Sequence, residues 1–277
     1  MKKTVLFAAA LVAGTAVSAQ TGEITSNRGE NWLSQDGDWA LTFDAAPLLN
    51  YAGNLFNGNL GNGGVAMNNL FNSQGAAGLG GNRVVIGGKK LIDANTAYRG
   101  QLRLGFGSHK ESNQVMQAGQ TDPTVTVEDQ VKDGFMGIDL GFGLEKRVGS
   151  TRVVGVYGAM FNVGFGSSKT TYTYGNALAA NNPVASRPTE TKNGSTFGLG
   201  LRAFAGVEWF CAPKISLSGE YTWGVAMTSE GYGSTSSEGW VNNAVKTNTQ
   251  DTGTKKGNFS IDTGVSGASI GVNFYFQ

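Results

Sequence analysis

The single histidine of the chain stands among residue types that support acyl transfer. His109 follows Ser108, and Ser112 lies three residues further on. An imidazole that takes a proton from a serine hydroxyl creates a nucleophile, so this group could serve a lipid-modifying enzyme at a membrane rim. Such a pair also needs a carboxylate to orient the ring, and the sequence indicates none in that role. We therefore predict that the chain is not an enzyme, and the rim-located lipid enzyme is kept as an alternative.

Metal and cofactor chemistry lack the residues that they need. Cys211 is the only cysteine, so no disulfide can form within the chain, and one cysteine with one histidine makes no ligand cluster. The glycine-rich stretch 78–81 is not followed by the Lys-Ser or Lys-Thr of a phosphate-binding loop. The sequence predicts neither a metal site nor a cofactor.

A further group of candidate residues is charged and lies at alternate positions of segments that also alternate in apolar residues. Alternation places side chains on one face of a strand, and in a narrow closed sheet the polar face is the interior. An unpaired charge there is costly, so we expect these residues to neutralise one another. A narrow conduit that uses them as its filter is the alternative. The predicted interior charges are Asp44, Arg99, Arg103, Asp139, Arg202, Glu208 and Glu220.

The elements that would hold these charges are long strands with two different faces. Every second residue from Met136 to Leu144 is apolar, and the intervening positions carry glycine and Asp139. The segment from Phe197 to Trp209 repeats the pattern. Both segments exceed the roughly 5 to 6 residues of an ordinary strand and suit the roughly 9 to 11 residues of a tilted membrane-spanning strand. The same test predicts strands near 37–48, 82–91, 96–108, 134–145, 152–167, 195–210, 214–226 and 258–276.

The predicted connections alternate in length. Short turns at one end and long polar loops at the other are typical of bacterial outer-membrane barrels, whose long loops face outward. The predicted fold class is therefore all-β, an eight-stranded antiparallel up-and-down transmembrane β-barrel. Short connections are predicted at 92–95, 146–151 and 211–213, and long ones at 49–81, 109–133, 168–194 and 227–257.

The N-terminus predicts export. Lys2 and Lys3 precede an apolar stretch that ends in small residues up to Ala19, which is the pattern of a secretory signal. The stretch is well short of the roughly 20 apolar residues of a spanning helix. We predict a signal peptide over 1–19 with cleavage after Ala19, an N-terminal periplasmic segment over 20–36 and a barrel domain over 37–277.

The charge balance argues against a polyanionic partner. The chain has 21 basic and 20 acidic residues, and two of the lysines lie in the predicted signal peptide. Nucleic-acid binding needs a basic patch or stripe, which the nearly neutral mature chain does not supply. We predict no nucleic-acid partner.

The last predicted strand ends in alternating aromatic residues, Phe274 and Phe276. With the signal, the eight strands, the loop alternation and the turn Phe-Cys-Ala-Pro-Lys at 210–214, the chain resembles the small OmpA-like outer-membrane β-barrel family. The resemblance implies a place in the outer membrane of a Gram-negative bacterium, in contact with outer-membrane lipid and lipopolysaccharide. It also implies insertion by the barrel assembly machinery, with Phe274 and Phe276 as the C-terminal assembly signal.

The expected function follows from where barrels of this size carry their activity. Function on a rigid scaffold lies mostly in the loops. We therefore expect a structural or binding role, with loops 49–81 and 227–257 facing an extracellular ligand or another envelope protein. A narrow, porin-like channel for small solutes is the alternative.

Overall fold

The computed structural model describes residues 24–45 and 86–277, and within these ranges the chain forms strands, turns and irregular segments. For these residues the prediction of an all-β fold is confirmed. The predicted signal peptide 1–19 and the predicted loop 49–81 lie outside the described residues. The strands are β1 (Trp39–Asp44), β2 (Ile86–Asp93), β3 (Thr96–Met116), β4 (Thr126–Val148), β5 (Val153–Thr173), β6 (Arg187–Lys192), β7 (Thr196–Ala212), β8 (Ile215–Glu230), β9 (Gly233–Val241), β10 (Ala244–Thr252) and β11 (Lys256–Phe276).

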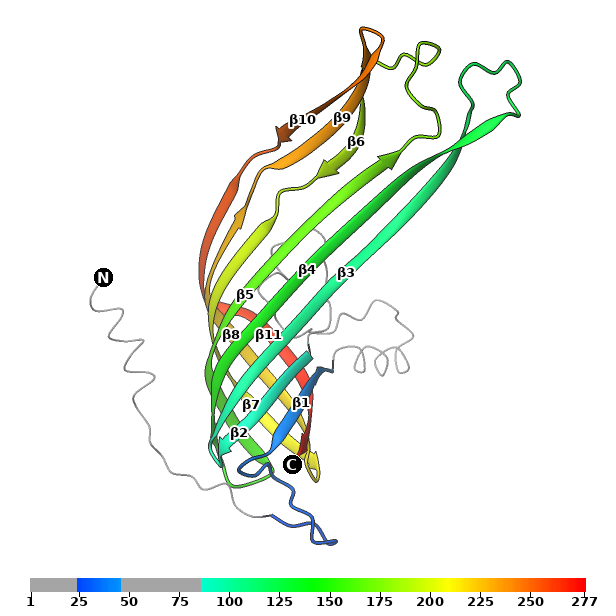
Figure 1. The fold of residues 1–277 in the computed structure, drawn as a ribbon. Helices are drawn as coiled ribbons and strands as arrows, with labels where there is room; N and C mark the ends of the chain where they lie inside the picture. The colour runs from blue at the N-terminus through cyan, green and yellow to red at the C-terminus, as the bar shows by residue number, and fades with distance from the viewer. Residues whose placement is uncertain (1–23, 46–85) are drawn as a thin grey trace, which may run out of the picture.

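Eight of these strands close into a ring whose neighbours are all antiparallel (Figure 1). Around the ring the order is β1, β2, β3, β4, β5, β7, β8 and β11. Closure occurs where β11 meets β1, with Trp39 opposite Phe276. The ring also depends on β7 pairing with β5, since β6 pairs with β5 higher up. Closure gives each ring strand a hydrogen-bonding neighbour on both sides.

Three tight turns join ring strands at one end of the ring. They lie at 94–95 between β2 and β3, at 149–152 between β4 and β5, and at 213–214 between β7 and β8. Lys214 has a φ of 60° and Gly149 a φ of 135°, values that suit tight reversals. These turns fall where short connections were predicted.

The prediction of long loops is wrong for 109–133 and 227–257, and it holds only in part for 168–194, where 174–186 is a connection between β5 and β6. Most residues of 109–133 and 227–257 belong to strands, because β3, β4, β5, β8 and β11 continue further than predicted and β6, β9 and β10 lie entirely in the predicted loops. The reason is that these extensions are polar on both faces. They therefore lack the apolar alternation that identifies a half-buried strand in a sequence, although their backbones pair as regularly.

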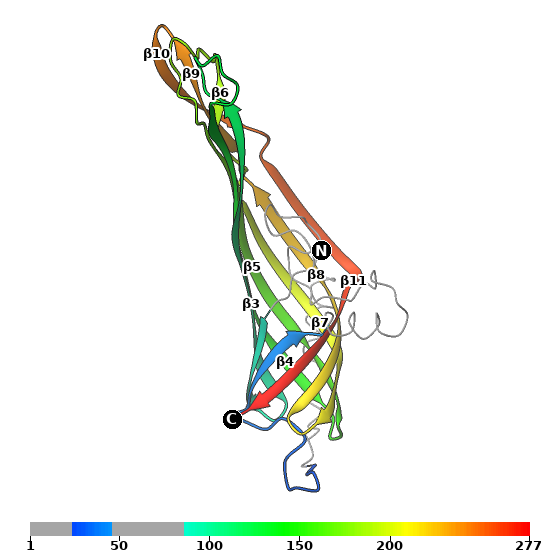
Figure 2. The ribbon, with the colours of Figure 1, turned by 90° about the vertical axis from the view of Figure 1, so that its right-hand side faces the viewer.

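The additional strand lengths build a tall extension above the ring. The upper parts of β3, β4 and β5 join β6, β9 and β10 as one curved sheet (Figure 1), which Figure 2 shows edge-on as a thin blade. β9 and β10 form a hairpin whose turn residues, Asn242 and Asn243, have φ values of 55° and 59°. Within the described ranges, the molecule is thus a ring with a blade on one side.

The segment before β1 closes the turn end of the ring. It lies directly below the ring in Figure 1. The backbone N–H of Lys214 donates to the carbonyl of Trp32 at 3.1 Å, and that of Leu91 donates to the carbonyl of Asp38 at 2.8 Å. Leu33 is buried with side chains from six ring strands. That apolar cluster, the end plug, comprises Leu33, Ala40, Leu91, Ala97, Val154, Val156, Phe210 and Tyr275.

Candidate functional site

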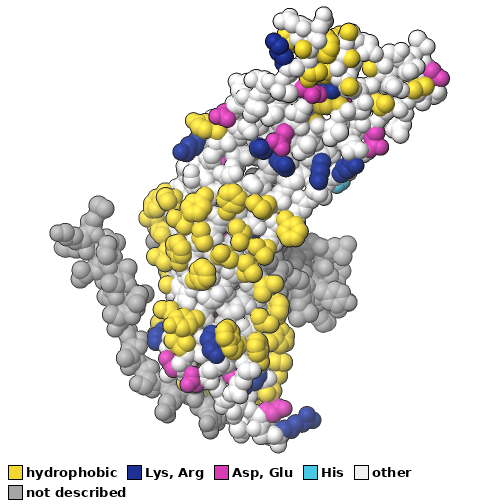
Figure 3. Space-filling model, viewed as in Figure 1, with side chains coloured by type: hydrophobic (Ala, Val, Ile, Leu, Met, Phe, Trp, Pro, Cys, Tyr) yellow, Lys and Arg dark blue, Asp and Glu magenta, His cyan; other side chains and the backbone are white. Residues whose placement is uncertain are grey.

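The outside of the ring carries a belt of exposed apolar side chains (Figure 3). Along β3 and β4 the even-numbered residues face outward, with Leu104 60% exposed and Phe142 59% exposed. The odd-numbered residues face the interior, so Arg103 and Asp139 are buried. Among the described residues, no helix has the length and hydropathy needed to cross a membrane. The ring is thus apolar outside and charged inside, the reverse of a water-soluble sheet.

Six buried charges form a network directly above the end plug. Three are basic and three are acidic, so their formal charges cancel. They come from β2, β3, β4, β7 and β8, which means that the ring must close before the network exists. We name this group the base network; its members are Lys89, Arg99, Glu145, Arg147, Glu208 and Glu220.

Glu145 lies at the centre of the base network and contacts all three of its cations. Its carboxylate oxygens lie 3.1 Å from the Lys89 ammonium, 3.4 Å from the Arg99 guanidinium and 2.7 Å from the Arg147 guanidinium. Each contact crosses from one strand to another or joins alternate residues of β4. Attraction in this buried interior offsets the cost of removing the charges from water only because the charged groups lie close together.

Glu208 is the second centre and is also fully buried. Lys89 lies 3.3 Å and Arg147 lies 3.0 Å from one of its oxygens. The other oxygen accepts a hydrogen bond from the Tyr275 hydroxyl at 2.6 Å and one from the hydroxyl of Ser216. Every side of this carboxylate is therefore occupied by a donor.

Arg99 links Glu145 to Glu220, the uppermost member of the base network. Its guanidinium lies 3.1 Å from Glu220 and stacks over the ring of Phe204 at 4.3 Å from the centroid. A planar guanidinium can satisfy a carboxylate and an aromatic face together, which an ammonium does less well.

A second polar group fills the next level of the interior. Arg202 donates to the side-chain oxygen of Asn162 at 2.9 Å and to that of Gln101 at 2.8 Å. Arg103 and Asp139 are directly opposite each other on β3 and β4, and both are buried. The structure thus brings six of the seven predicted charges into the interior, in two groups. The side chain of the seventh, Asp44, lies outside the described part of the chain.

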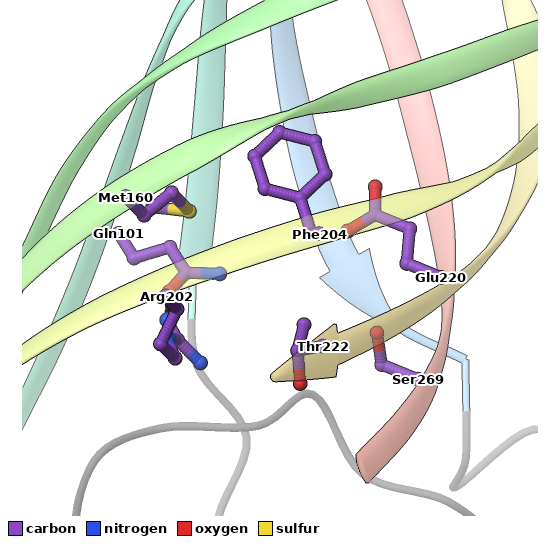
Figure 4. A pocket seen from close by; sticks show the side chains of 7 residues that line it. All are labelled: Gln101, Met160, Arg202, Phe204, Glu220, Thr222 and Ser269. Atoms are coloured by element: carbon purple, nitrogen blue, oxygen red, sulfur yellow. Dashed lines mark hydrogen bonds between the residues drawn. The ribbon is translucent and has the colours of Figure 1, made fainter. Parts of the chain in front are cut away.

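A small cavity separates the two levels. Its volume is about 20 Å³, which is room for about one or two water molecules. Figure 4 shows Arg202 and Glu220 on opposite sides of the cavity, and Phe204 and Met160 also line it. A space of this size does not hold a solute or a cofactor.

Three members of the base network were missed from the sequence. Glu145 and Arg147 continue the odd-numbered alternation of Asp139, so extending the predicted strand by two residues would have found Arg147. Lys89 stands next to Lys90, and either lysine could have been the interior one. Only pairing fixes the choice, since Lys89 is opposite Arg99 on the buried face.

His109 lies above the ring, in a shallow pocket of about 370 Å³ on β3, β4 and β5. Alternation places Ser108 and Ser112 on the opposite face of β3 from His109. The expectation that no carboxylate accompanies this histidine is wrong, because Glu111 lies 3.1 Å from the imidazole. Both side chains are about 70% exposed, so the contact leaves the imidazole in water. Asp133, across from His109 on β4, accepts a hydrogen bond from Thr170 at 2.5 Å.

The two phenylalanines predicted as the assembly signal lie at the end of β11, next to the aromatic residues of β1. Phe274 and Phe276 project outward from the end of β11, beside Phe43 and Trp39 of β1. Phe43 and Phe274 make an edge-to-face contact at 6.0 Å. The described residues contain no cluster of three or more potential metal ligands.

Comparison with known proteins gives weak structural likeness only. No family model and no curated protein sequence matches the chain. Among solved structures, a major outer membrane protein from Thermus thermophilus is similar at 10% identity and a TM-score of 0.26, covering 87% of this chain and 98% of that one. A likeness at this level does not by itself establish a common family.

Proposed function

We propose that the chain is an integral outer-membrane protein, a closed eight-stranded β-barrel of the OmpA-like kind with a structural or binding role and no catalytic activity. The observation that carries the proposal is the inverted ring: exposed apolar side chains outside, paired charges inside. In lipid every backbone group must be satisfied within the protein, and closed barrels meet this demand. The stretch 136–144 of β4 has the length that a tilted spanning strand needs.

The interior favours a closed barrel over a channel. The end plug, the base network and the second polar level follow one another along the axis, and the cavity between the two polar levels has a volume of only about 20 Å³. An eight-stranded barrel is about wide enough to be filled by its own side chains. Lipid-modifying activity at the rim would need an activated nucleophile beside His109. Ser108 and Ser112 lie on the other face of β3, and the hydroxyl of Thr170, which lines the same pocket, donates to Asp133 at 2.5 Å.

The orientation of the protein in the membrane is inferred from the difference between its turn end and its blade end. We place the turn end and its N-terminal segment in the periplasm, with the blade outside the cell. This arrangement agrees with export through a signal peptide over 1–19 and with insertion by the barrel assembly machinery through Phe274 and Phe276. An extracellular ligand or envelope protein would then contact the blade, including the β9–β10 hairpin, where a loop over 227–257 was expected. Gram-negative outer-membrane lipid and lipopolysaccharide would surround the ring.

Two measurements on the purified protein test this proposal. A closed barrel resists detergent until boiled, so unheated and heated samples should migrate differently on a detergent gel. In planar bilayers the protein should give no steady conductance. Identical migration, or a mature protein that is freely soluble in the periplasm, would contradict the barrel. Steady conductance that falls in Arg103→Ala or Glu220→Ala would replace the closed barrel with the narrow channel.

A further inference from the structure

Four lysines lie in two opposed pairs where the ring passes into the blade. Lys110 on β3 is directly opposite Lys132 on β4, and Lys169 on β5 is directly opposite Lys192 on β6. Lys110 and Lys132 continue the outward alternation of Phe106 and Met136. Like charges in directly opposed positions destabilise a sheet, so two such pairs side by side need a compensating anion.

One of the two pairs already has its anion. Glu190 lies 3.3 Å from the Lys169 ammonium and 2.9 Å from the Lys192 ammonium. The pair Lys110 and Lys132 has no such carboxylate within ion-pair distance in the described part of the chain. Glu128 interacts with Lys110 electrostatically, but it lies beyond ion-pair distance, and its carboxylate accepts a hydrogen bond from Gln130 at 2.7 Å. Two neighbouring lysines therefore face outward with no carboxylate at ion-pair distance among the residues that the structure describes.

The lysine pair is continuous with the apolar belt. Phe106, which is 83% exposed, and Met136 lie four residues below the lysines on the same face. At about 3.4 Å per residue and a tilt of about 40°, this separation is about 10 Å of height. Figure 3 shows basic side chains gathered just above the belt, over β3, β4 and β5. Lysine side chains can bend toward such a boundary while their stems cover apolar surface.

We propose that Lys110 and Lys132 bind the phosphate groups of lipopolysaccharide in the outer leaflet, with its acyl chains on the belt beside Phe106 and Met136. The inference rests on the proposed function for its orientation, and it adds the site and the charged group that is recognised. An ammonium pair offers six N–H donors to phosphate oxygens. The site is charged above and apolar below, so the ligand that fits it is amphiphilic.

Binding of lipopolysaccharide to the detergent-solubilised full chain tests the site. A lysine near an anionic surface strengthens binding to it. Lys110→Gln or Lys132→Gln should therefore weaken the affinity for lipopolysaccharide about fivefold, and the double variant should weaken it about 25-fold. Lys246→Gln, an exposed lysine on β10, is the matched control and should bind as the parent does. Lipid A without its phosphates should bind the parent as weakly as intact lipid binds the double variant.

The outcomes separate this inference from the barrel itself. If the double variant still shows heat-modified migration but binds lipopolysaccharide like the parent, the lysine site is wrong and the barrel stands. Equal loss in Lys246→Gln would assign the effect to overall charge and would also overturn the site. If the parent shows no heat-modified migration, the proposed function fails before the lipid is tested.

Discussion

Carboxylates are held in opposite ways in the ring and in the blade. In the ring, Glu208 is fully buried and is surrounded by Lys89, Arg147 and hydroxyl donors. In the blade, Glu190 contacts two lysines that are more than half exposed. Burial makes a paired charge costly to disturb, whereas water screens an exposed pair and replaces its partners. Similar ion pairs thus link neighbouring and distant strands inside the ring in one region, and lie on an exposed surface in the other.

The largest effect is expected from Glu208→Gln. This change leaves the buried Lys89 and Arg147 with Glu145 as their remaining acidic partner at ion-pair distance, and breaking a buried pair in this way costs about 3 to 5 kcal/mol. Urea unfolding in detergent, followed by loss of heat-modified migration, measures the change. Glu230→Gln is the control, because Glu230 pairs with Lys256 at the exposed end of β8. An effect below that of the control would show that the base network does not hold the ring closed.

The second effect concerns the outer face. Arginine at Leu140, an outward position of β4, should destabilise the inserted state by about 2 to 4 kcal/mol if this side chain lies near the lipid midplane. The matched control is arginine at Val245, an exposed apolar residue of β10 in the blade. Outer-membrane fractionation of cells that express each variant gives the readout. Normal assembly of Leu140→Arg would remove the lipid-facing assignment of the belt.

The third effect concerns the end plug. Leu33→Ala removes a side chain that packs against the apolar cluster, and a buried leucine truncated to alanine costs about 2 to 5 kcal/mol. We expect about 2 kcal/mol, the lower limit, because the segment before β1 can detach while the ring stays closed. Limited proteolysis should then cut the segment 24–38 faster than in the parent. Val241→Ala, at an exposed position of β9, should leave the cutting rate unchanged.

The ring strands could be predicted because their two faces lie in different environments, the exterior and the interior of the ring, and so carry different residue types. Met136 to Leu144 alternates cleanly, since one face meets the exterior belt and the other the packed interior. The interior partners could not be read in the same way. That Glu145 meets Arg99 and Arg147 depends on register and on closure of the ring, which the local alternation of one strand does not contain.

The strands of the blade were not predicted because both of their faces lie in the same environment. β10 is exposed along nearly all its length, so its sequence shows no alternation of apolar and polar residues that would identify a strand. One local signal was present, because Asn242 and Asn243 stand between two runs that contain valine and threonine. Asparagine tolerates the positive φ of a two-residue hairpin turn, and both residues adopt it here. Reading this pair as a turn would have predicted the β9–β10 hairpin.

The smallest effect is expected at Glu190 in the blade. Hydrogen bonds from Lys192 and then Lys169 lower the pKa of Glu190 in the folded protein. The contribution of Glu190 to the free energy of unfolding is therefore present above the unfolded pKa and is lost as the pH falls through the folded pKa. For an exposed pair this contribution is below about 1 kcal/mol. Glu190→Gln should therefore lower stability slightly at pH 7 and not at all at a pH below the folded pKa. Urea titrations of parent and variant at the two pH values measure the difference. A loss as large as that of Glu208→Gln would abolish the contrast between ring and blade, because it would show that exposure does not weaken an ion pair in this protein.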